Sequence, residues 1–210
     1  MTDPNYTALL IILDRSGSME MIKDDMVGGL RALLRDQQEL PGLVTVDVVQ
    51  FDSNVETTHQ FADPATLELS IEPRGRTALH DAIGIGISSF SARLDGLPAH
   101  AAPGTIQVIV VTDGHENASV EYSSAQVREL IEAKQADARW DFVFLGANQD
   151  AVVTGGQLGF RADSSMTFAA RGPEVSYSSE AASRYIRDRR QGNRQGFSSE
   201  ERRRSEGGER

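Results

Sequence analysis

The sequence predicts an α/β fold in which helices cover both faces of a mostly parallel sheet. Short apolar runs alternate along the chain with longer segments whose apolar residues recur at helical spacing. The first run, residues 9–13, is continuously apolar, which is typical of a strand buried on both faces. A turn at residues 52–54 separates two strand-like segments, so residues 55–61 are expected to form an antiparallel hairpin partner at a sheet edge.

The expected elements follow from these patterns together with cap residues and Pro/Gly breaks. Strands are predicted at residues 7–13, 43–51, 55–61, 105–112, 140–145 and 165–169. Helices are predicted at residues 24–40, 78–94, 123–138, 150–158 and 178–190. An open parallel sheet of this kind binds its ligands beyond the carboxyl ends of the strands.

The chain of 210 residues is predicted to form one domain, residues 1–190, followed by a tail. Residues 191–210 are rich in Arg, Gly, Ser, Glu and Gln, with Phe197 their one large apolar residue, so a disordered tail is expected. The chain has no cysteine, which excludes disulfides and thiolate metal sites. The N-terminal segment lacks a basic region, and its apolar run is too short for a signal or membrane helix, so we expect a cytoplasmic protein.

The net charge of −10 is unevenly distributed. From Arg184 onward nine arginines accompany five acidic residues, a net charge of +4, so the first 183 residues carry −14. A body this acidic disfavours nucleic acid and anionic membranes over its general surface. The Arg-rich tail is therefore the only candidate for a nucleic-acid contact, and a partner-binding arm is an alternative role for it.

Oxygen-bearing side chains follow two of the predicted strands where those strands end. Asp14, Ser16 and Ser18 follow the first strand at alternate positions, and Asp113 follows the strand at residues 105–112. Thr77 lies in a loop directly before a predicted helix. Because the carboxyl ends of parallel strands share one edge, these segments are expected to meet there. Carboxylate and hydroxyl oxygens suit a hard divalent cation such as Mg²⁺, so the sequence predicts a metal-dependent binding site.

Other interpretations of residues 14–18 fit less well. A helix cap needs one such residue, whereas three are present. An EF-hand loop needs Gly at its sixth position and Glu at its twelfth, where this chain has Met19 and Asp25. A phosphotransfer site would place a second acid at the position of Ser16. The four histidines have no zinc-like spacing.

Residues 14–19, 75–83 and 111–114 together resemble the von Willebrand factor A (vWA) family with all three segments of its metal-ion-dependent adhesion site (MIDAS). The resemblance covers about residues 5–170 and implies a doubly wound sheet of about six strands with one antiparallel edge strand. It also implies direct metal contacts from four residues and a direct or water-mediated contact from a fifth, in the order Asp14, Ser16, Ser18, Thr77 and Asp113. Residues 144–150 resemble a segment of intracellular bacterial and bacteriophage members.

The expected function is that of a non-catalytic module that binds an acidic residue of a partner protein. A carboxylate of the partner would fill the coordination position left open on a bound Mg²⁺ or Mn²⁺, with Ca²⁺ as a further option. One alternative is a metal-assisted hydrolase with His115 or Glu116 as general base, and another is a structural subunit whose metal only stabilises the fold. Arg74 and Arg76 are expected to be solvated or to steer an acidic partner, and Asp81 to favour a helix start.

Overall fold

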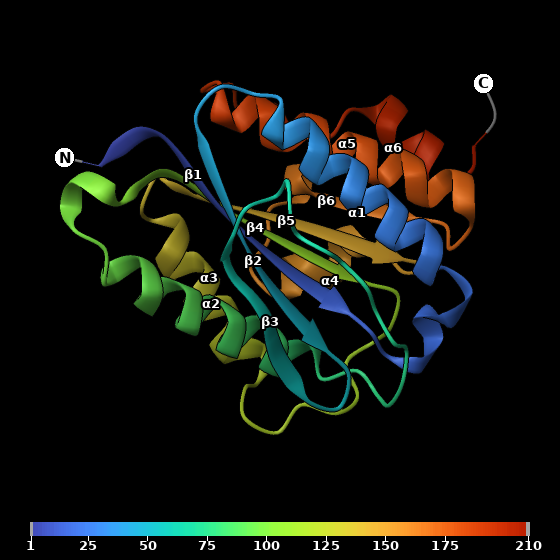
Figure 1. Cartoon of the computed structure of the whole chain (residues 1–210). Coiled ribbons are helices and arrows are strands. Elements are labelled where there is room, and N and C mark those ends of the chain that lie inside the picture. The colour runs from blue at the N-terminus through green and yellow to red at the C-terminus, as the bar shows by residue number, and fades with distance from the viewer. Residues whose placement is uncertain (1, 209–210) are drawn as a thin grey trace.

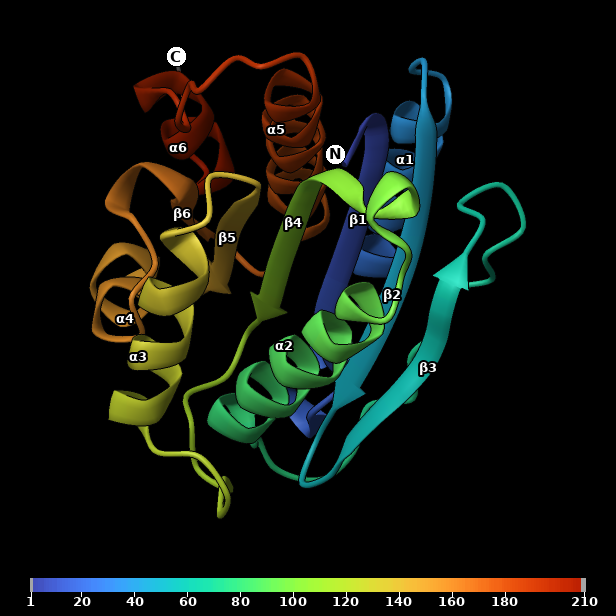
Figure 2. The ribbon, with the colours of Figure 1, turned by 90° about the vertical axis from the view of Figure 1, so that its left-hand side faces the viewer.

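The strands form one six-stranded sheet in a computed structural model that describes residues 2–208. They are β1 (Asp3–Asp14), β2 (Leu43–Phe51), β3 (Val55–Ala62), β4 (Pro103–Thr112), β5 (Trp140–Ala147) and β6 (Ser165–Phe168). Their order across the sheet is β3-β2-β1-β4-β5-β6. Among these neighbouring pairs only β2–β3 is antiparallel. In Figure 2 the β3 arrow points in the opposite direction to the β2 and β4 arrows. The predicted fold class, with its antiparallel edge strand, is confirmed.

β1 lies in the middle of the sheet and contributes side chains to two hydrophobic cores. Leu9, Ile11 and Leu13 belong to the core on one face, and Leu10 and Ile12 to the core on the other. This division follows from the alternation of side chains along a strand. All five side chains are completely buried, which is why this segment is apolar at every position.

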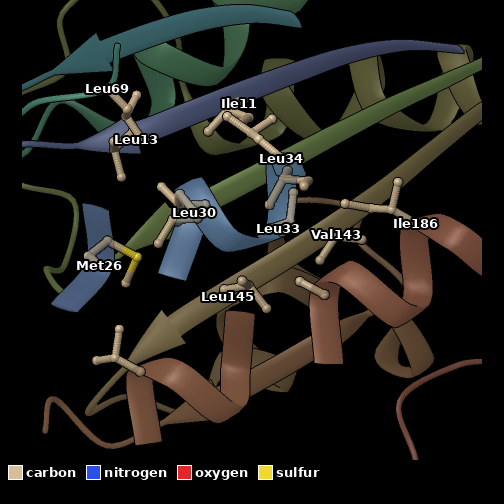
Figure 3. Close-up of a cluster of buried hydrophobic side chains, with 14 of the residues drawn as sticks. Ile11, Leu13, Met26, Leu30, Leu33, Leu34, Leu69, Val143, Leu145 and Ile186 are labelled. Atoms are coloured by element: carbon tan, nitrogen blue, oxygen red, sulfur yellow. The ribbon is translucent and has the colours of Figure 1, made fainter. Parts of the chain in front are cut away.

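Helices cover both faces of the sheet (Figure 1). One face is covered by α1 (Lys23–Gln38) and α5 (Gly172–Arg190), and the other by α2 (Leu79–Asp95), α3 (Ser124–Gln135) and the short α4 (Ala151–Gln157). Figure 3 shows the core beneath α1 and α5, where Leu30 and Leu34 of α1 lie with Leu145 of β5 and Ile186 of α5. Within residues 2–208, no helix combines the length and the apolar character that a membrane span requires.

α5 begins six residues earlier than the sequence predicted. Pro173 occupies the first turn, where its fixed φ and its missing N–H are compatible with a helix start. The added turns pack against α1 through Val175, which is completely buried. The two helices approach so closely that a Cβ at Gly29 would lie 2.2 Å from Ser179 Oγ.

Residues 191–208 correct the prediction of a disordered tail. Phe197 is only 7% exposed and packs against Tyr185 of α5, with the ring centroids 5.2 Å apart. The chain then forms α6 (Ser199–Ser205), which lies beside α5 in Figure 1. A single aromatic anchor therefore attaches a segment whose composition is otherwise polar.

Polar contacts complete the attachment of α6. The side chains of Ser198 and Glu201 form a reciprocal cap at its start, and the Glu201 carboxylate also pairs with Arg184 of α5. Arg202 donates to the carbonyl oxygen of Ser165 at the start of the edge strand β6. These bonds satisfy charges that composition alone suggested would be solvated. Residues 209–210 of the predicted tail and residue 1 of the predicted domain lie outside the described residues.

Candidate metal centre

Asp14, the last residue of β1, forms the buried end of the candidate site. Its Oδ1 accepts a hydrogen bond from the Ser16 N–H at 2.6 Å. Its Oδ2 accepts one from the Thr112 hydroxyl, at the end of neighbouring β4, also at 2.6 Å. The hydroxyl oxygens of Ser16 and Ser18 lie 3.1 Å apart. The end of β1 therefore supplies one carboxylate and two hydroxyls to this edge of the sheet.

The other two predicted donors approach from the end of β4 and from the loop before α2. The Ser18 hydroxyl donates to Asp113 Oδ1 at 2.6 Å. Thr77 is buried, and its side chain lies beside Gly114. A Cβ added at Gly114 would lie only 2.8 Å from Thr77 Oγ1. The backbone of Gly114 therefore packs closely against the Thr77 hydroxyl, with no room for a side chain. The structure brings the side chains of all five predicted residues to one edge, and the parallel order of β1 and β4 accounts for the meeting of Asp14 and Asp113 there.

An ion-pair network links the loop before α2 to the turns after β1 and β2, with Arg15 and Asp52 buried and Arg74 exposed. Asp52 Oδ2 accepts hydrogen bonds from Arg15 Nε and Arg74 Nε, each at 3.0 Å. The Arg74 N–H donates to the Arg15 carbonyl at 2.8 Å, and the Gly17 N–H to the Gly75 carbonyl at 3.4 Å. Burial raises the pKa of Asp52, but hydrogen bonds and the arginine charges outweigh it and hold that pKa below its usual value. Arg74 is therefore partly neutralised by Asp52.

The loop between β4 and α3 is held against the start of α2. The Asp81 carboxylate accepts the backbone N–H groups of residues 120, 121 and 122 at 2.7–2.9 Å. Thr77 and Asn117 exchange two bonds, from the Thr77 N–H to Asn117 Oδ1 and from the Asn117 N–H to the Thr77 carbonyl, each at 3.0 Å. Asp81 lies in the first turn of α2, as expected, and in addition it orders this loop.

The carboxylate of Glu116 is committed to the same loop. It accepts the N–H groups of Ala118 and Ser119 and the Ser119 hydroxyl at 2.7–2.8 Å. It also accepts the His80 N–H at 2.9 Å. Burial raises the pKa of Glu116, but these bonds outweigh burial and lower it. A carboxylate held in this way is a poor general base, and the neighbouring His115 is exposed to solvent.

Of the two carboxylates of the site, Asp14 is completely buried and Asp113 is half-buried. Burial raises the pKa of Asp14 to about 6, against the hydrogen bonds from Thr112 and Ser16 that lower it, and the charge of Asp113 adds to the increase. Burial raises the pKa of Asp113 as well. A divalent cation between them would offset this desolvation, because the charged form of a buried carboxyl is costly without a partner.

The donor chemistry of the site fits a hard cation. Two carboxylates and three hydroxyls are all oxygen donors, the type that Mg²⁺ and Mn²⁺ prefer. Within residues 2–208, no three side chains of His, Cys, Asp or Glu come together in a way that could hold a metal ion. Any metal at this edge would therefore depend on the hydroxyls as well as on the two carboxylates.

Several supporting residues were not foreseen from the sequence. Thr112 bonds the buried Asp14, Arg15 and Asp52 form the ion pair beneath the loops, and Gln149 reaches the carbonyl of Gly114 at 3.4 Å. Arg15 lies between two residues predicted to face the site, and alternation along an extended segment indicates that its side chain points elsewhere. The partners of Thr112 and Gln149 lie far away in sequence, so no local pattern indicates them.

Comparison with known proteins supports the fold. No protein-family model and no curated protein matches the sequence. Among solved structures, proximal thread matrix protein 1 of the mussel byssus has a TM-score of 0.61 and 14% identity, covering 87% of this chain and 46% of that chain. The ArnB paralog VWA2 of Sulfolobus acidocaldarius has a TM-score of 0.55 and 14% identity, covering 84% of this chain and 44% of its own. A von Willebrand factor type A protein of Catenulispora acidiphila has a TM-score of 0.54 and 14% identity, covering 85% of this chain and 42% of its own.

A further structure of the mussel protein bears on the metal. In it the MIDAS motif is occupied by zinc, and it matches this chain with a TM-score of 0.62 and 15% identity, over 87% of this chain and 46% of that chain. This chain spans less than half the length of each of these neighbours. At such low identity the likeness concerns the fold. The chain has the α/β fold of von Willebrand factor A domain proteins.

Proposed function

We propose that this protein is a non-catalytic interaction module that binds an acidic residue of a partner protein through a divalent cation. The observation that carries the proposal is the convergence of oxygen donors from three separate segments at one edge of the sheet. The 2.6 Å hydrogen bond from Ser18 to Asp113 joins residues 95 positions apart in the chain. A helix cap or a turn needs one such side chain, whereas here three chain segments each contribute side-chain oxygens.

The metal would be held by Asp14, Ser16, Ser18, Thr77 and Asp113, the last directly or through water. When bound, the cation supplies a positive centre for the oxygen of a carboxylate. Mg²⁺ and Mn²⁺ take six oxygen ligands, so five protein donors leave one position for water or for a partner's carboxylate. The three hydroxyls are neutral, and the two carboxylates balance the cation only if both are ionised. An incoming carboxylate therefore meets a cation whose charge is at most just balanced.

Mg²⁺ or Mn²⁺ is the metal that the donor set favours, with Ca²⁺ as a further option. The zinc in the MIDAS of the mussel protein supports metal binding at the corresponding edge of this fold. Zinc prefers nitrogen and sulfur ligands, and the five residues proposed here offer only oxygen. Residues 144–150 resemble a segment of intracellular bacterial and bacteriophage vWA proteins, and this supports a bacterial or bacteriophage module that acts in the cytoplasm.

The hydrogen bonds of Glu116 make it a poor general base for a hydrolase at the same edge. Glu116, one of the two general bases considered, already accepts four hydrogen bonds and has a lowered pKa. Among the arginines near the C-terminus, Arg184 and Arg202 are engaged within the fold and Arg204 lies over the Tyr177 ring, which leaves fewer of them for nucleic acid. A protein partner is therefore the simplest ligand for the site.

A peptide-display selection would test the proposal. Random peptides would be selected on the immobilised protein in Mn²⁺ and released with EDTA. We expect the released peptides to share an Asp or Glu whose change to Asn or Gln abolishes binding. Binding should also be lost in Asp14→Ala and retained in Glu129→Gln, which changes an exposed carboxylate on α3.

Two results would contradict the proposal. Peptides that bind equally well in EDTA would exclude a metal-mediated contact. An increase in melting temperature with Mn²⁺ but no metal-dependent peptide would leave the metal with a structural role alone.

A further inference from the structure

The turn after β5 contains a buried side chain that the proposed metal site does not yet explain. Asn148 adopts a left-handed backbone conformation, with φ 51°, and its Oδ1 accepts the Ala170 N–H at 3.1 Å. Asp150 caps α4 by accepting the N–H groups of residues 152 and 153. The carbonyl of Gln149 accepts the Thr167 hydroxyl at 3.0 Å. Backbone and neighbouring groups thus fix this turn without the side chain of Gln149.

The side chain of Gln149 points back towards the candidate metal site. It is 8% exposed, and its Nε2 donates to the carbonyl of Gly114, directly after Asp113, at 3.4 Å. Its Oε1 is buried and has no hydrogen-bond partner within the described residues. A buried amide oxygen without a partner destabilises the fold, and an apolar side chain of similar size would avoid that cost. Packing therefore does not explain why an amide side chain occupies position 149. The hydrogen bond from Gln149 Nε2 to the Gly114 carbonyl does explain it.

The carbonyl of Gly114 matters because it competes for a single proton. The Thr112 hydroxyl lies 2.6 Å from Asp14 Oδ2 and 3.2 Å from the Gly114 carbonyl, and it can donate to only one of them. The Gly114 N–H donates to the same Thr112 hydroxyl at 3.2 Å. The direction of the Thr112 hydroxyl proton is therefore the one feature of this group that can change. The Gln149 donor satisfies one of the two acceptor positions of the Gly114 carbonyl, which weakens its attraction for the Thr112 proton and favours the bond from Thr112 to Asp14.

We propose that Gln149 is a positioning residue for the metal site, acting on Asp14 through Gly114 and Thr112. The inference rests on the proposed function, because it concerns how well the same site holds a cation. A fixed Asp14 Oδ2 leaves the orientation of the whole carboxylate defined before the metal arrives. Outer partners of metal ligands commonly contribute to affinity in this way.

The test is a titration of Mn²⁺ into chelator-treated protein, together with urea unfolding in EDTA. Gln149→Met keeps the length of the side chain and removes both the donor and the unpaired oxygen. We expect Mn²⁺ to bind about tenfold more weakly, while the unfolding midpoint in EDTA stays equal or rises. Gln149→Glu, which also lacks the N–H donor, should weaken binding at least as much. A merely structural role would instead lower the unfolding midpoint and leave Mn²⁺ affinity unchanged.

Gln107 provides a matched control. It is 1% exposed, its Nε2 donates to the Ile186 carbonyl at 3.1 Å, and its Oε1 is likewise buried without a partner within the described residues. It lies on β4 five residues before Thr112, at about 3.3 Å per residue, so it is well away from the site. Gln107→Met should leave Mn²⁺ affinity unchanged.

A double-mutant cycle with Thr112→Val tests the route. If Gln149 acts through the Thr112 proton, Gln149→Met should weaken Mn²⁺ binding by less than about twofold in the Thr112→Val background. A full and additive loss in that background would overturn the inference, as would wild-type affinity in Gln149→Met. A wild-type protein that binds no Mn²⁺ would overturn the proposed function itself, so the two failures are distinguishable.

Discussion

Replacing Asp14 with asparagine is expected to stabilise the metal-free protein at neutral pH while abolishing metal binding. Asparagine keeps the shape of the side chain and removes its charge. Its Oδ1 can accept the Ser16 N–H as Asp14 does, and its Nδ2 can donate to the Thr112 oxygen. The Thr112 proton can then turn to the Gly114 carbonyl at 3.2 Å. The hydrogen bonds are therefore preserved, and the substitution mainly changes the charge.

The magnitude follows from the raised pKa of Asp14. Burial raises that pKa from 3.8 to about 6, so the folded state holds a proton more tightly than the unfolded state does. The stability from this group is full below pH 3.8 and is lost as the pH rises through about 6. Each tenfold change in proton affinity corresponds to about 1.4 kcal/mol, so the charged carboxylate costs about 3 kcal/mol at pH 7. We expect Asp14→Asn to recover about 1–3 kcal/mol, because the new hydrogen bonds are weaker than those to a carboxylate.

Urea unfolding in EDTA measures this gain. At pH 7 the midpoint of Asp14→Asn should exceed that of the wild type, and the difference should shrink at pH 4, where the wild-type carboxyl is protonated. Adding Mg²⁺ should raise the midpoint of the wild type and leave that of Asp14→Asn unchanged. Glu129→Gln, on an exposed part of α3, should follow the wild type in every condition. If Asp14→Asn were less stable than the wild type at pH 7 in EDTA, the buried charge of Asp14 would not destabilise the metal-free fold, and this reasoning would be refuted.

Four further predictions concern packing and metal affinity. Gly28→Ala, whose new Cβ would have no atom from outside its own helical turn within 4 Å, should raise the free energy of unfolding by about 0.5–1 kcal/mol. Gly29→Ala, whose Cβ would lie 2.8 Å from Ser179 Cβ, should lower it by about 1–3 kcal/mol, and equal effects would contradict the close α1–α5 packing. Phe197→Ala should cost about 3 kcal/mol in urea unfolding, whereas an unchanged midpoint would mean that the C-terminal segment does not pack. Mn²⁺ affinity, measured by titration, should fall about tenfold for each pH unit below about 6, because the metal must displace the proton of Asp14, and a flat profile would exclude that carboxyl as a ligand.

The central strands could be predicted because their physical constraints are local. β1 is buried on both faces, so every position from Leu9 to Leu13 is apolar and the run is visible in the sequence. The hairpin after β2 is marked by polar turn residues, which restricted β3 to an antiparallel edge. The approach of Asp14 to Asp113 could also be predicted, since both follow parallel strands that lie side by side.

The C-terminal region was harder because composition and local signals disagreed. A low apolar content indicated disorder, whereas the spacing of Ser198 and Glu201 is that of a capping box and marks the start of α6. Phe197 decides the outcome through Tyr185, a contact that no local pattern reveals. The role of Gln149 is hidden for the same reason, because its partner Gly114 lies on the neighbouring strand's loop.

A crystal structure with Mn²⁺, located by its anomalous scattering, would test directly whether the five residues proposed as ligands bind a metal. We expect one strong peak at the edge formed by the ends of β1 and β4, at about 2 Å from the nearest oxygens of Asp14, Ser16 and Ser18. The peak should disappear in crystals of Asp14→Ala. A peak elsewhere on the molecule, or none at this edge in saturating Mn²⁺, would contradict the assignment of these residues as a metal site.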